Sequence, residues 1–336
     1  MTCPCRAGML IAFLLLALLC STAGCSTGEQ HQKTVLKVVP AGSLLQPFAE
    51  VEQEFEATHP QVDVQIEGHG SIQAIRQVTD LHRNVDVVAV ADASLIPDLM
   101  FRTDQATGAN VTDSYTPFAR NAMVIAYTNR SRYADEISQD NWYGILTRRG
   151  VRTGFSNPML DAAGYRTVMV ALLASDYYRN ATIFPALIGR RFTPPLVINA
   201  TNGVQTVGLP ETMRPSDPDL VIRDGSIYVI SLLEAGGIDY AFEYRSVAEG
   251  HNLLWIDLPQ EIDLSSPAYA AEYGRARVTL GFQRFSAIGK DRHGQPIVYA
   301  ITIPNTAPNP DLAREFADLV IEKAKTGGKG WPAPLA

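Results

Sequence analysis

From residue 34 onward, short apolar runs rich in valine and isoleucine alternate with longer segments whose apolar residues recur every three to four positions. A first series comprises expected strands at 35–40, 62–66 and 85–91 and expected helices at 44–58, 72–79 and 94–101. A second series comprises expected strands at 151–156, 220–223 and 240–242 and expected helices at 163–175 and 226–236. This alternation is typical of an α/β fold and argues against an all-helical or all-strand chain.

Two further extended segments, 122–127 and 296–304, would carry the chain between the two series. The body of about 300 residues is long for a single hydrophobic core, so we expect two lobes. Lobe 1 is predicted at 34–118 and 297–336, where 308–323 forms a closing helix, and lobe 2 at 119–296. Two lobes joined by two crossover strands place a ligand in the cleft at the strand ends and permit hinge closure around it.

The first 25 residues have the features of a secretory leader. Arg6 precedes an apolar run at 9–19, which is too short to span a bilayer as a helix of the mature protein. The segment 22–25 resembles a lipobox and ends in Cys25, the residue that would be lipidated. We predict a leader over 1–25, a tether over 26–33 and a body lipid-anchored at the extracellular face of the cell membrane. An uncleaved N-terminal anchor helix is the alternative.

Composition narrows the range of functions. All four cysteines lie in the first 25 residues, which leaves the body without a disulfide, a cysteine metal site or a catalytic cysteine. The formal net charge of −7 argues against nucleic acid or an anionic membrane surface as a partner. Any anion would therefore have to be bound through local dipoles rather than through the overall field of the protein.

Two Gly-Ser turns, Gly42-Ser43 and Gly70-Ser71, each stand between an expected strand and an expected helix. Glycine lets the backbone approach a ligand, and a helix N-terminus offers free N–H groups with roughly half a positive charge. Either serine alone could be an ordinary N-cap of its own helix. Two such turns in one lobe predict an oxyanion site. In the second lobe Asp161 opens another helix, where a plain N-cap is the alternative interpretation.

Four segments, 41–44, 155–166, 239–248 and 298–304, closely resemble in content and order the archaeal-type tungstate/molybdate-binding proteins of ABC importers. The resemblance runs from about residue 34 to the C-terminus. It implies a type II periplasmic-binding-protein fold that binds tungstate or molybdate between two lobes. It also implies a monomeric solute-binding subunit that is not an enzyme and has no resident cofactor. Its partners would be a membrane permease and an ATPase.

Carried over by motif, the oxyanion would contact a set of small and polar residues from both lobes: Gly42, Ser43, Ser71, Asp161, Ala162, Ala163 and Tyr244. The family can also use an aspartate and a glutamate that complete a six-coordinate metal centre. Asp161 matches the aspartate as a possible direct ligand of tungsten or molybdenum, whereas Ser226 stands at the position of the glutamate. Ser226 avoids repulsion by the dianion and can donate to an oxo group, so a four-coordinate, hydrogen-bonded oxyanion is an open alternative.

Other functions receive less support from the sequence. A sulfate or phosphate receptor keeps the same architecture, with Asp161 as acceptor for the proton of phosphate. An exported hydrolase using Ser43 or Ser71 lacks a histidine with any positional signal. We expect Arg245 to pair with the adjacent Glu243 rather than with an anion.

Overall fold

The computed structural model describes residues 33–103, 108–281 and 291–335. From Val35 onward the chain forms one compact unit. The predicted leader 1–25 with Cys25, and tether residues 26–32, lie outside the described residues and stay predictions. Within the described part, none of the helices has the length and apolar character needed to cross a membrane.

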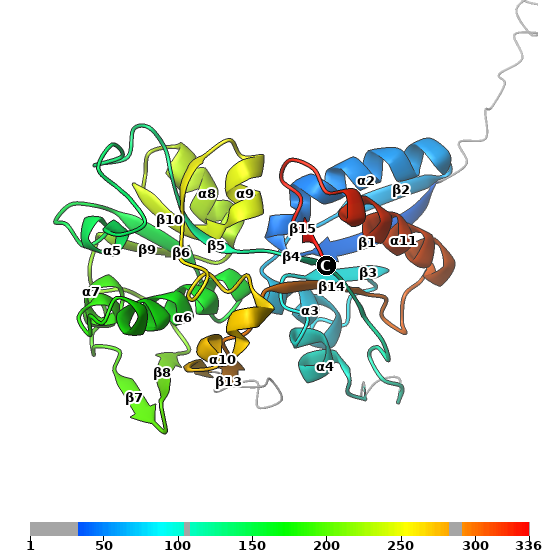
Figure 1. The fold of residues 1–336 in the computed structure, drawn as a ribbon. Coiled ribbons are helices and arrows are strands. Elements are labelled where there is room, and N and C mark those ends of the chain that lie inside the picture. Colours follow the sequence, from blue (N-terminus) through cyan, green and yellow to red (C-terminus); the bar gives the residue numbers. More distant parts are fainter. Residues whose placement is uncertain (1–32, 104–107, 282–290, 336) are drawn as a thin grey trace, which may run out of the picture. The chain divides into compact units, whose positions relative to one another are not determined.

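The first sheet has six strands in the order β15-β4-β14-β3-β1-β2 (Figure 1). Its strands are β1 (Thr34–Pro40), β2 (Val62–Ile66), β3 (Val87–Val90), β4 (Thr116–Arg120), β14 (Val298–Thr302) and β15 (Ala333–Pro334). The helices that follow or accompany them are η1 (Gly42–Leu44), α2 (Leu45–Thr58), α3 (Ser71–Thr79), α4 (Leu95–Met100) and α11 (Pro310–Thr326). We call this sheet with these helices the first lobe.

Apolar spacing explains how α2 and α11 pack together. Phe48 and Phe55 of α2 are buried and meet Phe316 of α11 edge-on, with ring centroids 6.0 and 5.5 Å apart. Edge-to-face aromatic contacts of this kind add roughly 0.5–1.5 kcal/mol each beyond the area they bury. The C-terminal helix is thereby fixed to the first lobe, and Figure 1 shows the two helices side by side.

The second sheet has five strands in the order β11-β5-β10-β6-β9. Its strands are β5 (Met123–Tyr127), β6 (Thr153–Ser156), β9 (Leu220–Arg223), β10 (Tyr240–Tyr244) and β11 (Leu254–Asp257). The accompanying helices are α5 (Trp142–Ile145), α6 (Ala162–Tyr177), α7 (Ile183–Leu187), η2 (Gly189–Arg191), α8 (Ser226–Glu234) and α9 (Arg245–Gly250). Strand β10 pairs in parallel with β6 and antiparallel with β5.

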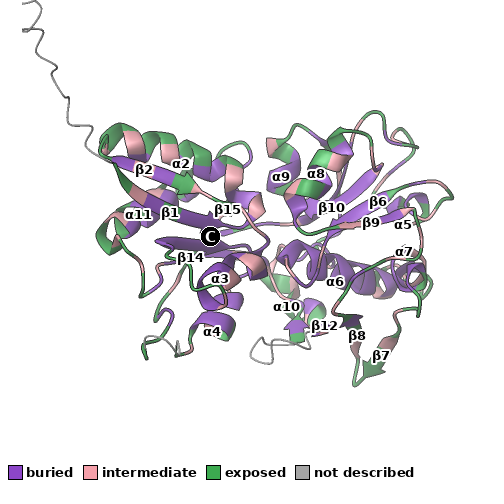
Figure 2. Ribbon diagram, turned by 180° about the vertical axis from the view of Figure 1, so that it is seen from behind, coloured by how far each residue is buried: buried purple, intermediate pink, exposed green. Residues whose placement is uncertain are grey.

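A third sheet of four strands, in the order β13-β12-β8-β7, was not predicted. It comprises β7 (Ile198–Thr201), β8 (Val204–Pro210), β12 (Ala276–Gly281) and β13 (Asp291–His293), with η3 (Pro267–Tyr269) and α10 (Ala270–Tyr273) between β11 and β12. Helix α6 contacts β5, β6 and β10 of the second sheet and β12 of the third. It is therefore buried from Ala162 to Ser175, as its uniform colour in Figure 2 shows. We call the second and third sheets with their helices the second lobe.

The chain passes between these lobes twice, between β4 and β5 and again between β13 and β14. The expected crossover segment 122–127 is strand β5 of the second sheet, and 296–304 contains β14, which pairs with β3 and β4 of the first. The predicted lobe boundaries themselves stay predictions. Both connections lie beside Asn121, whose side chain donates to the Ser246 hydroxyl at 2.8 Å and to the Tyr299 hydroxyl at 3.1 Å.

Candidate functional site

The N-termini of three helices meet at one buried carboxylate, that of Asp161. Its oxygens accept hydrogen bonds from the backbone N–H groups of Ser226 in α8, at 3.1 Å, and Ala163 in α6, at 3.4 Å. Burial raises the pKa of Asp161, and the Ser226 amide, the Ser156 hydroxyl and the Ala163 and Ser71 amides oppose that rise. Asp161 is thus the N-cap of α6, as one interpretation expected, but it also receives donors from α3 and α8.

The first turn of α3 is directed at the segment that precedes α6. The backbone N–H groups of Ile72 and Gln73 both donate to the carbonyl oxygen of Leu160, at 3.1 Å each. Glycine at position 70 makes this approach possible, because an added Cβ would lie 2.8 Å from the Cβ of Asp161 and nearer still to the Leu160 carbonyl. The donors predicted for an oxyanion in this turn therefore face the second lobe.

Neither predicted serine caps its own helix. Gly70 is the N-cap of α3, and no side chain caps the N-terminus of α3, η1 or α2. The Ser71 hydroxyl oxygen accepts from the Ala91 N–H at 3.0 Å, and the Ser43 hydroxyl oxygen accepts from the Tyr299 hydroxyl at 3.0 Å. The ordinary N-cap interpretation is therefore wrong for both, and each hydroxyl still has its own hydrogen to donate.

The Gly42-Ser43 turn lies against the start of α8. A Cβ added at Gly42 would lie 2.9 Å from Cγ2 of Ile227 and 3.6 Å from the hydroxyl oxygen of Ser226. The amide of Gly42, however, already donates to the carbonyl oxygen of His69 at 2.7 Å. Gly42 thus contributes close approach at this point, while its amide is engaged within the first lobe.

Tyr244 is buried at the end of β10, and its hydroxyl is oriented by Arg166. One guanidinium nitrogen of Arg166, Nη1, donates to the Tyr244 hydroxyl oxygen and to the Ala91 carbonyl oxygen, each at 2.7 Å. Because that hydroxyl oxygen is an acceptor for Arg166, its own hydrogen remains available for another acceptor. Burial raises the pKa of Tyr244 well above its usual value, so the group keeps its proton.

Arg166 also brings a buried positive charge to the site, which sequence reasoning missed. The side chain is 2% exposed, and its Nη2 lies 3.5 Å from a carboxylate oxygen of Asp92 in the first lobe. Burial alone would raise the pKa of Asp92, but the Arg166 charge and the hydroxyls of Tyr165 and Ser94 outweigh it and lower that pKa. The signal was present in the segment Gly164-Tyr165-Arg166, whose residue types suggested only a helix start.

Glu243 is a second buried acid of this region, and it too was missed. The residue is fully buried near the end of β10, and its Oε1 accepts from the N–H of Tyr244 at 2.8 Å. Its pKa is raised to about 8, first by burial and then by the charge of Asp161, against the Tyr244 amide and the Ser226 hydroxyl. The expected pairing with Arg245 is wrong, because Arg245 lies 3.8 Å from a carboxylate oxygen of Asp257 instead.

The structure thus joins the predicted residues into one contiguous network, although not all by the same means. Ser71, Ala163 and Ser226 surround the Asp161 carboxyl, Gly42 contacts the start of α8, and Ser43 reaches Tyr244 through Tyr299, whose ring centroid is 5.9 Å from that of Tyr244. Ala162 is buried as the first residue of α6. Across the described ranges, no group of three histidine, cysteine, aspartate or glutamate side chains is arranged to hold a metal ion.

Two cavities adjoin this network. One of about 330 Å³ is lined by the turn before α3, which includes His69, and by the start of α8, which includes Ser226 and Tyr228. Another of about 520 Å³ is lined by Ser43 and by residues of α2, α8 and α9. Both have Gly42 and Ile227 in their walls. Of the predicted oxyanion residues, Gly42, Ser43 and Ser226 line these cavities.

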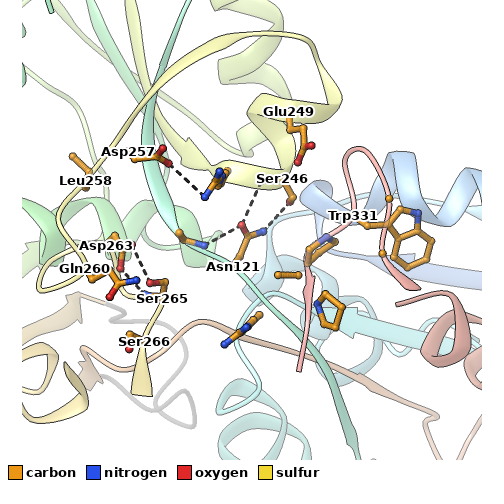
Figure 3. A pocket seen from close by; sticks show the side chains of 18 of the residues that line it. Asn121, Ser246, Glu249, Asp257, Leu258, Gln260, Asp263, Ser265, Ser266 and Trp331 are labelled. Atoms are coloured by element: carbon orange, nitrogen blue, oxygen red, sulfur yellow. Dashed lines mark hydrogen bonds and ion pairs between the residues drawn. The ribbon is translucent and has the colours of Figure 1, made fainter. Parts of the chain in front are cut away.

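A larger cavity, of about 640 Å³, lies near the two interlobe connections and is shown in Figure 3. Its walls carry Ser246, Glu249, Asp263 and Trp331, and none of the predicted oxyanion residues. Asn121, labelled in the same view, is its link to the site, because the Asn121 amide bonds both Ser246 and Tyr299.

The sequence model of the bacterial extracellular solute-binding protein family matches residues 36–326. The molybdate/tungstate-binding protein WtpA of Pyrococcus abyssi is 41% identical over 332 residues, covering 95% of this chain and 90% of that protein. Its namesake from Thermococcus kodakarensis is 40% identical, covering 93% and 86%. A solute-binding protein of Methanoculleus marisnigri is also 40% identical, covering 92% and 86%.

Among solved structures, the periplasmic molybdate-binding protein of Azotobacter vinelandii matches with a TM-score of 0.55 at 15% identity, covering 88% of this chain and 94% of that one. At that identity the match shows the fold alone, and it confirms the predicted two-lobed α/β periplasmic-binding-protein architecture. The resemblance read from the sequence is confirmed by the relatives. The chain belongs to the bacterial extracellular solute-binding protein family.

Proposed function

We propose that this protein is the solute-binding subunit of an ABC importer and that it captures tungstate and molybdate between its lobes. One observation carries the proposal: backbone donors from the starts of α3, α6 and α8 meet at a single buried point around Asp161. Helix N-termini favour anions, and three of them suit a tetrahedral oxyanion better than a neutral solute. The relatives from Pyrococcus and Thermococcus, which are named for binding molybdate and tungstate, supply the choice of anion.

The proposed ligand contacts are those predicted from the sequence. The hydroxyls of Ser43, Ser71, Ser226 and Tyr244 replace water around the oxo groups, and each bond to the charged ligand contributes roughly 1.5–3 kcal/mol. Arg166 orients the Tyr244 hydroxyl, while its own charge is balanced by the buried Asp92. Selection against sulfate would depend on the smaller size of that ion, because the charge is the same.

Calorimetric titration of the full-length protein with tungstate, molybdate, sulfate and phosphate tests this function. We expect tight binding of the first two and no measurable heat from sulfate or phosphate. Binding of sulfate or phosphate without measurable heat from tungstate or molybdate would show that the proposed ligand is wrong, while the assignment to the solute-binding family would stand.

We further propose that binding is the whole activity and that no cofactor is resident. The hydroxyl oxygens of Ser43 and Ser71 accept hydrogen bonds from the Tyr299 hydroxyl and the Ala91 amide, and in the described ranges neither hydroxyl is hydrogen-bonded to a histidine. A serine nucleophile needs an adjacent base to be activated. Incubation with a fluorophosphonate probe should leave both serines unlabelled, and labelling of either would support a hydrolase instead.

The remaining parts of the proposal concern the oligomeric state of the protein, its membrane anchor and its transport partners. We propose a monomer that is lipid-anchored through Cys25 at the extracellular face of the membrane and delivers its anion to a permease and its ATPase, without contact to nucleic acid. The Cys25→Ser variant should move from the detergent phase to the aqueous phase in a partition assay. Sedimentation of the soluble variant should give the mass of one chain.

A further inference from the structure

Two acids of the first lobe pair with two arginines of the second lobe. Nη2 of Arg292, in β13, donates to a carboxylate oxygen of Asp98, in α4, at 2.7 Å. Arg166, in α6, lies 3.5 Å from Asp92, which stands between β3 and α4. In Figure 1 both α4 and β13 lie in the lower half of the view. The side chain of Arg292 is only 5% exposed, so solvent ions screen its charge less than that of a surface pair.

Asp92 accepts further hydrogen bonds from outside the first lobe. Its carboxylate oxygens accept from the Tyr165 hydroxyl of α6 at 2.5 Å and from the side-chain amide of Gln295 at 3.2 Å. The first lobe thus contributes two negative charges to this contact and the second lobe two positive charges. Opening of the lobes would separate each charge from its partner, whereas closure pairs them, although desolvation offsets much of their attraction.

The pair of Asp98 and Arg292 lies apart from the predicted oxyanion residues. Neither belongs to that set, and neither lines the cavities of about 330, 520 and 640 Å³ described above. The pair therefore joins the lobes through a contact of its own, which does not require an anion. A contact that exists in only one of two conformations shifts the population toward that conformation.

Building on the proposed function, we infer that Asp98 and Arg292, together with Asp92 and Arg166, form an interlobe latch that stabilises the closed protein without touching the captured anion. Asp98 and Arg292 are then positioning residues, because they hold together the two lobes that supply the oxyanion donors. The latch raises the fraction of protein in the form that retains the anion. It forms once the lobes meet, so its loss should affect the rate of release and not the rate of capture.

Stopped-flow mixing with tungstate, followed by intrinsic tryptophan fluorescence, tests this division between the two rates. Asp98 is suited to substitution because its side chain is 43% exposed. Asp98→Asn should release tungstate about 3- to 10-fold faster with an unchanged association rate, and Asp98→Glu should restore most of the loss. Asp311→Asn is the matched control, because Asp311 is an exposed aspartate that pairs with Arg314 within α11. An unchanged release rate in Asp98→Asn would overturn the inference.

Small-angle X-ray scattering of the protein without any anion tests the latch independently of binding. Asp98→Asn should have a larger radius of gyration than the wild-type protein, and Asp98→Lys, which sets two positive charges side by side, a larger one still. Asp311→Asn should scatter as the wild type does. Identical scattering from all four proteins would overturn the inference. If the wild-type protein binds neither tungstate nor molybdate, the proposed function is wrong, and this scattering series still decides whether the latch exists.

Discussion

Substitution of Gly70 by alanine tests the contact between α3 and the segment before α6. The Gly70 backbone has φ −64° and ψ 149°, which alanine adopts without strain, so the first lobe should fold normally. The added Cβ, however, would lie 2.8 Å from both the Leu160 carbonyl carbon and the Asp161 Cβ, well inside ordinary contact distance. We therefore expect this segment to retreat by about 1 Å.

The expected loss of binding free energy follows from the hydrogen bonds between α3 and the segment before α6. Ile72 and Gln73 donate to the Leu160 carbonyl, at roughly 1 kcal/mol each, and the Ser71 amide interacts with the Asp161 carboxyl, at roughly 1.5–3 kcal/mol. Partial to nearly complete loss of these three interactions would cost about 2–4 kcal/mol. If closure of this contact is needed for capture, tungstate binding weakens by about 30- to 1,000-fold.

Calorimetry of Gly70→Ala against wild type measures this loss, and a thermal scan without ligand checks the fold. The matched control is Gly208→Ala, because a Cβ at Gly208 has nothing within 4 Å. We expect the control to bind as wild type and both variants to unfold within a few degrees of it. Wild-type affinity in Gly70→Ala would show that the contact between α3 and the Leu160 carbonyl takes no part in binding.

Three further predictions concern the site and the fold. Arg166→Met removes the donor to the Tyr244 hydroxyl, and calorimetry should show tungstate binding at least about tenfold weaker with a lowered unfolding temperature. The double variant Ser43→Ala with Ser71→Ala should lose oxyanion binding while its circular dichroism stays unchanged. Burial raises the pKa of Asp263 to about 6 from 3.8, so its contribution to stability is full below pH 4 and is lost as the pH rises through 6. Urea unfolding measured between pH 4 and 6 should show this decline in the free energy of unfolding, about 3 kcal/mol at most, in the wild-type protein and not in Asp263→Asn.

Local patterns were sufficient for most of the elements near the site. Strands at 62–66 and 220–223 have the predicted bounds, and α3 and α6 begin within one residue of the predicted starts. Alternating valines or apolar stripes specify such elements from a few neighbouring residues. The four-stranded sheet was not predictable in this way. Its central strands β8 and β12 pair in parallel across a long sequence separation, and β7 is largely exposed, so no short window reveals them.

Glycine and serine at helix starts allowed some of the candidate site residues to be predicted. The buried charged residues Glu243 and Arg166 could not be predicted in this way. Glu243 and Arg245 are close in the sequence and opposite in charge, which predicted that they pair. In the structure β10 ends at Tyr244 and α9 begins at Arg245, so the arginine leaves the face of the strand. Arg166 contacts Ala91 and Asp92 of the other lobe, a relation that no spacing within α6 can show.

The cavity beside the starts of α3 and α8 makes this protein suitable for an optical sensor. Tyr228, in the first turn of α8, lines that cavity and is 57% exposed, while His69 lines it from the other lobe. All native cysteines lie in the first 25 residues, so Tyr228→Cys would place a single thiol in the folded body. A solvent-sensitive dye on that thiol would report changes in the separation of the two helix starts as fluorescence, in real time and without labelling the anion.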